Sequence, residues 1–290
     1  MKSLKYSFIL LLVAAIWGFS FVAQRSGMEF VGPFTFNGVR FLLGSISLLP
    51  LYFLQKDRVI KKPSEGFNSI WLAGLLLGTA LFIAASLQQI GMQYTTAANG
   101  GFITSLYVVL VPLFYLFVKR KVGMNIWIGA VLAAVGLYFL SVQEGLRINW
   151  GDSLVLMSAV FWAIHVMLIG YFAPRFSIIL ITIIQFVTTA VFSLGAALIL
   201  EDMQWTQIVE GAIPIIYGGV FAVGIGYTLQ VYAQKKVASE QAAIILSFES
   251  AFALLGGWLL LNEQHGWKAL MGAALMLVGI IISQVKIKKS

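Results

Sequence analysis

Residues 129–136 read GAVLAAVG, and residues 272–279 read GAALMLVG, 143 positions further along the chain. The two stretches share both terminal glycines and the alanine, leucine and valine between them. Further matches, 142 to 145 positions apart, join Leu87-Gln88 to Leu229-Gln230, Trp17 to Trp162, and Phe41 to Phe186. Loop insertions produce this kind of small drift in spacing. The sequence therefore predicts two related halves, residues 1–145 and 146–290.

The composition is that of a membrane protein. The chain has 290 residues, of which 60% are hydrophobic and only 10% charged, with a mean hydropathy of +0.93. Soluble domains carry about 25% charged residues, so an ordinary soluble or disordered protein is excluded. The absence of cysteine excludes a disulfide framework and a thiolate metal site. Lys2 and Lys5 precede a long apolar run without a small-residue cleavage site, which predicts a retained first helix rather than a secretory signal.

Apolar runs bounded by charged or helix-breaking residues predict an all-α integral membrane protein with ten transmembrane helices. Their approximate ranges are 5–24, 33–54, 70–92, 96–118, 124–143, 152–173, 176–200, 211–233, 238–261 and 267–285. Each half holds five helices, an odd number, so the halves enter the membrane in opposite directions. The prediction is two inverted five-helix repeats, with a substrate site near the middle of the membrane between them.

The net charge of +8 follows from an uneven distribution of basic residues. With the N-terminus inside, the inner segments hold Lys2, Lys5, Lys56, Arg58, Lys61, Lys62, Lys119, Arg120, Lys121, Arg175, Lys235, Lys236, Lys286, Lys288 and Lys289. The outer segments hold only Arg25, Arg147 and Lys268. Cytoplasmic loops are enriched in Lys and Arg. We therefore predict a multi-pass protein of the cytoplasmic (plasma) membrane, with both termini in the cytoplasm and no nucleic-acid partner.

Several short motifs occur in a characteristic order along the whole chain. They are Trp17-Gly18-Phe19-Ser20-Phe21, Arg40-Phe41, the stretch 91–97 followed by Pro112, Phe248-Glu249-Ser250, Leu260-Leu261-Asn262-Glu263, and Gly272. In this order and spacing the sequence resembles the EamA-type branch of the drug/metabolite transporter superfamily. It departs from that pattern at Ser250, Lys121 and Asn262, where proline, glutamate and glycine are usual.

The resemblance implies a ten-helix carrier that works by alternating access. Helices one, three and four, with six, eight and nine, would surround a central cavity. The implied activity is export of small organic metabolites such as amino acids, or of drugs.

Two charged residues lie deep within predicted spans, where each charge costs about 2.5–3.5 kcal/mol on insertion scales. Arg40 shares a helix face with Asn37, Gly44 and Ser47. It can bind an anionic substrate group, or it can be a structural arginine. Glu249, expected near the middle of the ninth span, can exchange protons and so couple transport to a proton gradient. It can also hydrogen-bond a neighbouring helix or pair with Arg40.

Uncharged polar and aromatic residues complete the candidate site, since such groups orient ligands in mostly apolar cavities. His165 can line the cavity or simply pack in the core. The predicted substrate-binding residues are Trp17, Ser20, Arg40, Gln88, Asn99, Tyr107, Trp162, His165, Tyr227, Gln230 and Glu249.

Other classes of function have less support in the sequence. No nucleotide-binding loop is present, no metal or cofactor is predicted, and the chain is not expected to be an enzyme. The alternative is an intramembrane enzyme acting on a lipid or lipid-linked substrate. The expected partners are a small-molecule substrate, such as an amino acid or amphiphilic drug, and membrane lipid. A monomer suffices because one chain holds both orientations, although a dimer is compatible with the sequence.

Overall fold

The computed structural model describes residues 2–55, 69–141, 149–262 and 266–285, and these residues form helices without any strand. The π-helix is named η2. The elements are α1 (Lys2–Gly27), α2 (Pro33–Ser47), α3 (Leu49–Gln55), α4 (Ile70–Gly91), α5 (Ala97–Thr104), α6 (Tyr107–Phe117), α7 (Met124–Ser141), α8 (Trp150–Phe172), α9 (Ile178–Leu200), α10 (Trp205–Glu210), α11 (Ala212–Ile216), η2 (Tyr217–Tyr227), α12 (Thr228–Gln234), α13 (Ser239–Leu246), α14 (Glu249–Leu261) and α15 (Trp267–Gln284). The prediction of an all-α architecture is confirmed for these residues.

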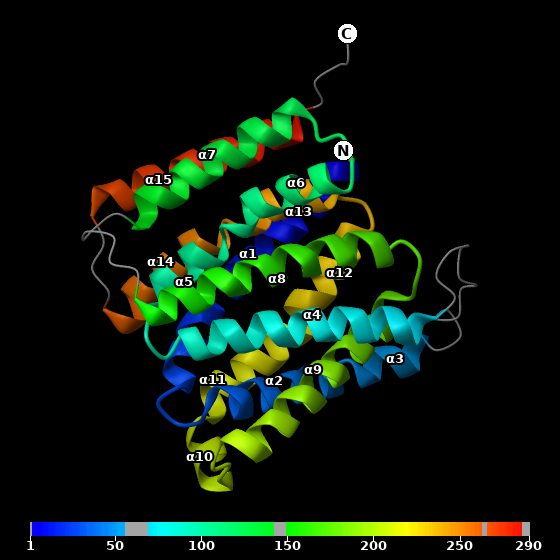
Figure 1. The fold of residues 1–290 in the computed structure, drawn as a ribbon, viewed down its shortest axis with the longest axis vertical. Helices are drawn as coiled ribbons and strands as arrows, with labels where there is room; N and C mark the ends of the chain where they lie inside the picture. The colour runs from blue at the N-terminus through cyan, green and yellow to red at the C-terminus, as the bar shows by residue number, and fades with distance from the viewer. Residues whose placement is uncertain (1, 56–68, 142–148, 263–265, 286–290) are drawn as a thin grey trace.

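The long helices lie side by side, with α7 and α15 at one end of the molecule and α9 and α10 towards the other (Figure 1). Eight segments of the described chain are long and apolar enough to cross a membrane: Leu4–Gly27, Pro33–Leu54, Ile70–Gly91, Ala97–Phe117, Trp150–Phe172, Ile178–Leu200, Ala212–Gln234 and Ser239–Leu261. Two shorter apolar helices, Met124–Phe139 and Leu270–Gln284, lie where the other two spans were predicted. The chain is thus a multi-pass membrane protein.

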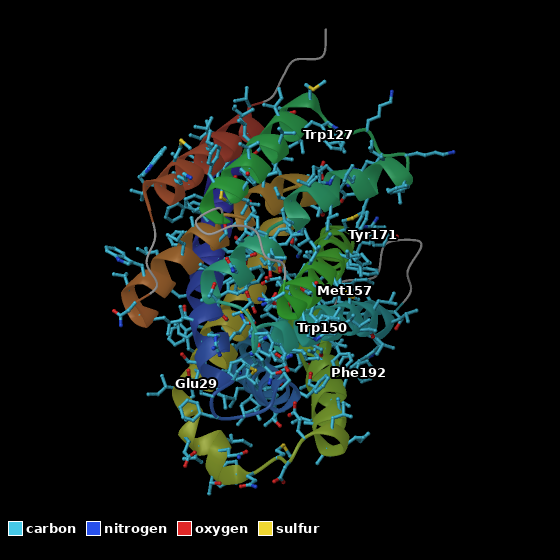
Figure 2. The ribbon with its side chains drawn as sticks, turned by 60° about the vertical axis from the view of Figure 1, so that its left-hand side comes forward. Glu29, Trp127, Trp150, Met157, Tyr171 and Phe192 are labelled. Atoms are coloured by element: carbon cyan, nitrogen blue, oxygen red, sulfur yellow. The ribbon has the colours of Figure 1, made fainter. Side chains whose placement is uncertain are left out.

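Apolar side chains cover the outside of the helices. Figure 2 shows Met157 on α8 and Phe192 on α9 along the outer side of the molecule, and both side chains are exposed. Trp150, at the start of α8, is exposed as well. Exposed apolar side chains are favourable only where lipid replaces water, so this surface fits the bilayer.

Two predicted spans, 96–118 and 238–261, are interrupted rather than continuous. The first is divided into α5 and α6, and the second into α13 and α14. At the interruptions, the Val108 amide bonds the Ser105 carbonyl, and the Ser250 amide bonds the Ser247 carbonyl, in tighter turns than an α-helix makes. The two interruptions touch, because the Ser105 hydroxyl donates a hydrogen bond of 3.1 Å to the Ser247 carbonyl. Glu249 therefore begins a helix instead of lying in the middle of one.

The predicted span 211–233 consists of three helical segments, α11, η2 and α12. The π-helical part, Tyr217–Tyr227, is wound more widely than an α-helix. This geometry is rare in proteins overall, but where it occurs it is often at a functional site. It lies very close to α1: a Cβ added to Gly226 would be only 2.6 Å from the Trp17 indole nitrogen. Glycine at this position allows the π-helix and Trp17 to share the space.

The repeated glycines that opened the sequence analysis lie at one helix–helix interface. A Cβ added to Gly129 of α7 would be 2.8 Å from the carbonyl oxygen of Gly279 in α15, and one added to Gly136 would be 2.6 Å from that of Gly272. The two helices therefore run antiparallel with their backbones in close contact. Small residues allow such close approach inside membranes, where dispersion forces drive helix association.

We expect Gly136→Ala to destabilise this interface, because the new methyl group meets a backbone carbonyl that cannot move aside. Overpacking of this kind costs about 1–3 kcal/mol. The thermal unfolding midpoint in detergent should fall by several degrees. The matched control is Gly195→Ala on α9, where an added Cβ meets nothing within 4 Å. Equal midpoints for the two variants would contradict the interface.

Candidate functional site

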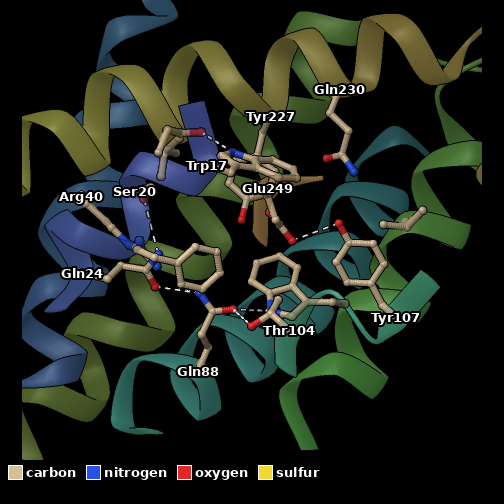
Figure 3. Close-up of a pocket in the computed structure, with 15 residues that line it drawn as sticks. Trp17, Ser20, Gln24, Arg40, Gln88, Thr104, Tyr107, Tyr227, Gln230 and Glu249 are labelled. Atoms are coloured by element: carbon tan, nitrogen blue, oxygen red, sulfur yellow. Dashed lines mark hydrogen bonds between the residues drawn. The ribbon is translucent and has the colours of Figure 1, made fainter. Parts of the chain in front are cut away.

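A small cavity lies in the interior between helices of both halves. Its lining residues are Trp17, Ser20, Phe21, Gln24, Arg40, Gln88, Thr104, Tyr107, Trp162, Val166, Ala222, Val223, Tyr227, Gln230 and Glu249 (Figure 3). The cavity volume is about 40 Å³, room for a few water molecules. Binding pockets for small ligands are several times larger. The cavity is thus too small for a metabolite in this structure, which could enter only after the helices move apart.

Gln88 of α4 connects one wall of the cavity. Its amide nitrogen donates to Gln24 Oε1 at 2.7 Å, and its amide oxygen accepts from the indole of Trp162 at 2.7 Å and from Thr104 at 3.2 Å. Gln24 in turn donates to the Ser20 hydroxyl at 3.4 Å. Helices α1, α4, α5 and α8 are therefore joined by side-chain hydrogen bonds inside the cavity wall (Figure 3).

Arg40 of α2 brings a positive charge to the cavity without a carboxylate partner. Its side chain is buried, and the residue forms no hydrogen bond or ion pair with any described residue. The guanidinium carbon lies 5.2 Å from the centre of the Phe36 ring and 5.1 Å from that of Phe41. Contacts with aromatic faces stabilise a guanidinium only partly. Its hydrogen-bond donors thus remain available to an anionic group.

Glu249 lies at the first residue of α14, beside the interruption. Its Oε1 accepts a hydrogen bond of 3.0 Å from the Tyr107 hydroxyl and lies 3.5 Å from the Ser105 hydroxyl. Tyr107 is itself the first residue of α6. The two interrupted spans thus position the carboxyl group and its donor. Of the alternatives left open for Glu249, the hydrogen bond to a neighbouring helix is present, whereas no ion pair joins it to Arg40 among the described residues.

Tyr227, at the end of the π-helix, is the centre of an aromatic cluster. Its ring centre lies 4.7 Å from that of Trp17. The Tyr227 ring also stacks on the Trp162 ring, with their centres 6.2 Å apart. His165 lies behind this cluster, 5.9 Å from the Tyr227 ring, and its Nε2 pairs with Gln185 Oε1 at 3.0 Å. His165 therefore packs behind the cavity instead of lining it.

Gln230 contributes a polar group that nothing in the described chain satisfies. The residue is 1% exposed, and neither its amide oxygen nor its amide nitrogen has a hydrogen-bond partner. Figure 3 shows its side chain directed towards the other lining residues. A buried amide without partners costs roughly 1–3 kcal/mol, which a ligand or a water molecule in the cavity would recover.

The structure brings together nine of the eleven predicted site residues at the cavity: Trp17, Ser20, Arg40, Gln88, Tyr107, Trp162, Tyr227, Gln230 and Glu249. Asn99 lies elsewhere, in the first turn of α5 next to its Thr96 cap. Its helix begins only two residues earlier, so Asn99 is far from the middle of the span. Gln24 and Thr104 also line the cavity but were not among the residues predicted from the sequence, although each is three or four positions from a predicted residue.

The described residues hold no cluster of three His, Cys, Asp or Glu side chains suited to a metal ion. What the cavity offers is one guanidinium, one carboxyl group, three amides and several aromatic faces. These groups suit binding of a small polar molecule with an apolar part.

Membrane-spanning helices around a central cavity with polar side chains are an arrangement found in membrane transporters. Comparison with known proteins agrees: the EamA-like transporter family matches residues 4–142 and again residues 149–284. An uncharacterized transporter of Archaeoglobus fulgidus is 33% identical over 96% of this chain and 85% of its own length. The uncharacterized transporter YoaV of Bacillus subtilis is 26% identical over 93% of this chain and 94% of its own length. The chain belongs to the EamA-like transporter family, which confirms the resemblance seen in the sequence.

A solved crystal structure shares this fold. It is 16% identical in sequence, and the match covers 98% of this chain and 96% of that chain with a TM-score of 0.77. The shared fold extends over nearly the whole length of both chains, so α7 and α15 belong to it as much as the longer helices do.

Proposed function

We propose that this protein is a secondary carrier that exports small organic solutes, such as amino acids or amphiphilic drugs, by alternating access and without an enzymatic activity. The observation that carries the proposal is the unpaired, buried Arg40, which lines the central cavity together with Glu249. Intramembrane charges of this kind mark substrate and ion pathways.

The proposed architecture is ten spans in two inverted repeats, residues 1–145 and 146–290. Contacts between residues matched by the repeat support it: Gly129 faces Gly279 while Gly136 faces Gly272, and the rings of Phe41 and Phe186 lie 6.0 Å apart. Reciprocal contacts between equivalent residues are typical of two-fold symmetry. With 18 residues, α7 is about 27 Å long, close to the thickness of the hydrocarbon core.

We place both termini in the cytoplasm, with the protein in the plasma membrane. The turns after α6, α8 and α12 carry Lys119 to Lys121, Arg175, and Lys235 with Lys236. These turns lie at the same end of the bundle in Figure 1, the end at which α1 begins. The opposite end carries Glu201, Asp202 and Glu210. The distribution of Lys and Arg assigns the basic end to the cytoplasm.

A zwitterionic substrate fits the charges of the cavity. Its carboxylate would pair with Arg40, whose planar fork suits bidentate binding of a carboxylate. Its ammonium group would bind the Glu249 carboxylate, and the Gln230 amide would satisfy a further polar group. The rings of Trp17, Trp162 and Tyr227 would contact the apolar part. A proton and an ammonium group then compete for Glu249, which couples export to proton entry.

An asymmetry in the cavity supports two alternating states. Trp162 donates to Gln88, but its repeat equivalent Trp17 does not donate to Gln230, the equivalent of Gln88. Trp17 instead donates to the Ala222 carbonyl of the π-helix at 3.0 Å. The Gln88 amide thus joins the helices on one side of the cavity, whereas the equivalent Gln230 amide has no partner and Trp17 bonds the backbone instead. Exchange of the two arrangements would open the cavity to the other side.

Solute uptake by the purified protein in proteoliposomes tests the proposal. We expect saturable uptake of one or more amino acids or amphiphilic cations, accelerated by an inside-acid pH gradient that drives protons out in exchange. Uptake that rises without saturation would indicate a channel. Chemical conversion of the solute in detergent, without a second compartment, would indicate an enzyme, and either result would contradict the carrier.

A further inference from the structure

An open groove lies between α6 and α8, away from the central cavity. Its lining residues are Phe114, Tyr115, Phe117, Val118, Arg120, Ile164, Met167, Leu168, Gly170, Tyr171 and Arg175. Its volume is about 830 Å³, far larger than that of the central cavity. Its walls are apolar and aromatic, and its charged members are two arginines.

Both arginines lie at the same end of the groove. Arg120 follows the end of α6, and Arg175 follows the end of α8, which are on one side of the bundle in Figure 1. Each guanidinium lies over a tyrosine ring of the groove, Arg120 over Tyr115 at 4.4 Å and Arg175 over Tyr171 at 3.8 Å. These contacts hold the two cations over the groove wall instead of leaving them extended into water.

Both arginines keep donors for a further anion. Arg175 donates to the Tyr171 carbonyl, and no described carboxylate pairs with it. Arg120 lies 3.6 Å from the mostly buried Glu240, and the arginine side chain is itself 50% exposed, so part of its guanidinium remains accessible. A guanidinium has five N–H donors. The end of the groove therefore has a net positive charge and unused donors.

The geometry matches that of a phospholipid in a leaflet. The groove follows the helices, so an acyl chain could lie along Phe117, Met167 and Leu168 while a phosphate contacts the arginines at the helix ends. Basic pockets between transmembrane helices bind anionic headgroups, and arginine forks suit phosphate oxygens. We propose that the groove between α6 and α8 binds one anionic phospholipid, with its headgroup on Arg120 and Arg175.

Native mass spectrometry of the purified protein, mixed with equal amounts of phosphatidylglycerol and phosphatidylcholine, tests the proposal. We expect one bound phosphatidylglycerol at about tenfold preference over phosphatidylcholine. The double variant R120Q/R175Q should lose this preference. Met167→Trp should reduce occupancy by filling the groove while both cations remain. Unfolding midpoints near that of the unchanged protein would show that the variants remain folded.

The matched control is K5Q/K236Q, which removes two exposed positive charges outside the groove. This variant should keep the preference for phosphatidylglycerol. Equal binding of both lipids, or an unchanged preference in R120Q/R175Q, would overturn the proposal. Displacement of the lipid by millimolar glycerol phosphate would also overturn it, because the site would then bind the phosphate without the acyl chain. The measurement involves no transport, so its outcome is independent of the proposed solute flux.

Discussion

Replacing Arg40 with methionine should abolish binding and transport of any substrate that carries a carboxylate, without loss of thermal stability. The guanidinium is buried without a described carboxylate or hydrogen-bond partner, so folding gains little from it. An isolated buried charge is costly for the folded protein. Truncating one partner of a buried charge pair costs roughly 2–5 kcal/mol, which corresponds to about a 30-fold loss of affinity or more.

Equilibrium binding and uptake should be measured together with the unfolding midpoint of each variant. Arg40→Lys should retain part of the affinity, since it keeps the charge but loses the bidentate fork. Arg25→Gln, which removes a cation outside the cavity lining, should behave like the unchanged protein. Loss of transport together with a large fall in the midpoint of Arg40→Met would show that Arg40 is structural.

The sequence predicted the bounds of several long helices well, because the bilayer imposes their length. The predicted range 70–92 is α4 (Ile70–Gly91), and 176–200 nearly coincides with α9 (Ile178–Leu200). Helical spacing also identified the cavity-facing side of α1, where Trp17 and Ser20 lie at the cavity with Gln24 one turn further on. Charge and periodicity thus indicate which side of a helix faces the interior.

The interruptions and the depth of individual side chains could not be predicted in this way. Neither Ser105 nor Ser247 is a helix breaker. The two interruptions are joined by a hydrogen bond between these residues, which are 142 positions apart in the sequence. His165 lies one turn from Trp162 and shares its side of α8, but its ring reaches Gln185 of α9. Periodicity gives direction, whereas tertiary packing decides which side chain reaches the cavity.

The interruptions also explain why a carboxyl group can lie at this depth. Interrupted spans place helix ends and irregular backbone at the middle of the membrane, where transporters bind ions and substrates. Tyr107 and Glu249 begin the second parts of the two spans, and a hydrogen bond of 3.0 Å joins them. The carboxyl group is therefore held at the cavity by both halves of the chain, and its protonation can affect both.

We expect Glu249→Gln to uncouple transport from the proton gradient. The amide has the size of the protonated acid but cannot release a proton, so an inside-acid gradient should no longer accelerate uptake. Exchange of labelled for unlabelled solute needs no net proton movement and should persist. The affinity of the variant for the solute should be about 10- to 100-fold weaker, since a hydrogen bond to a charged group is worth roughly 1.5–3 kcal/mol.

The matched control is Tyr107→Phe, which removes the hydrogen bond to Glu249 but leaves the carboxyl group free to titrate. This variant should still respond to the gradient, although with altered affinity. If Glu249→Gln responds to the gradient as the unchanged protein does, another group carries the proton and Glu249 has a structural role. If the unchanged protein ignores the gradient while its uptake saturates, the carrier is a uniporter. These outcomes separate coupling from substrate binding, because exchange and gradient-driven uptake are measured on the same vesicles.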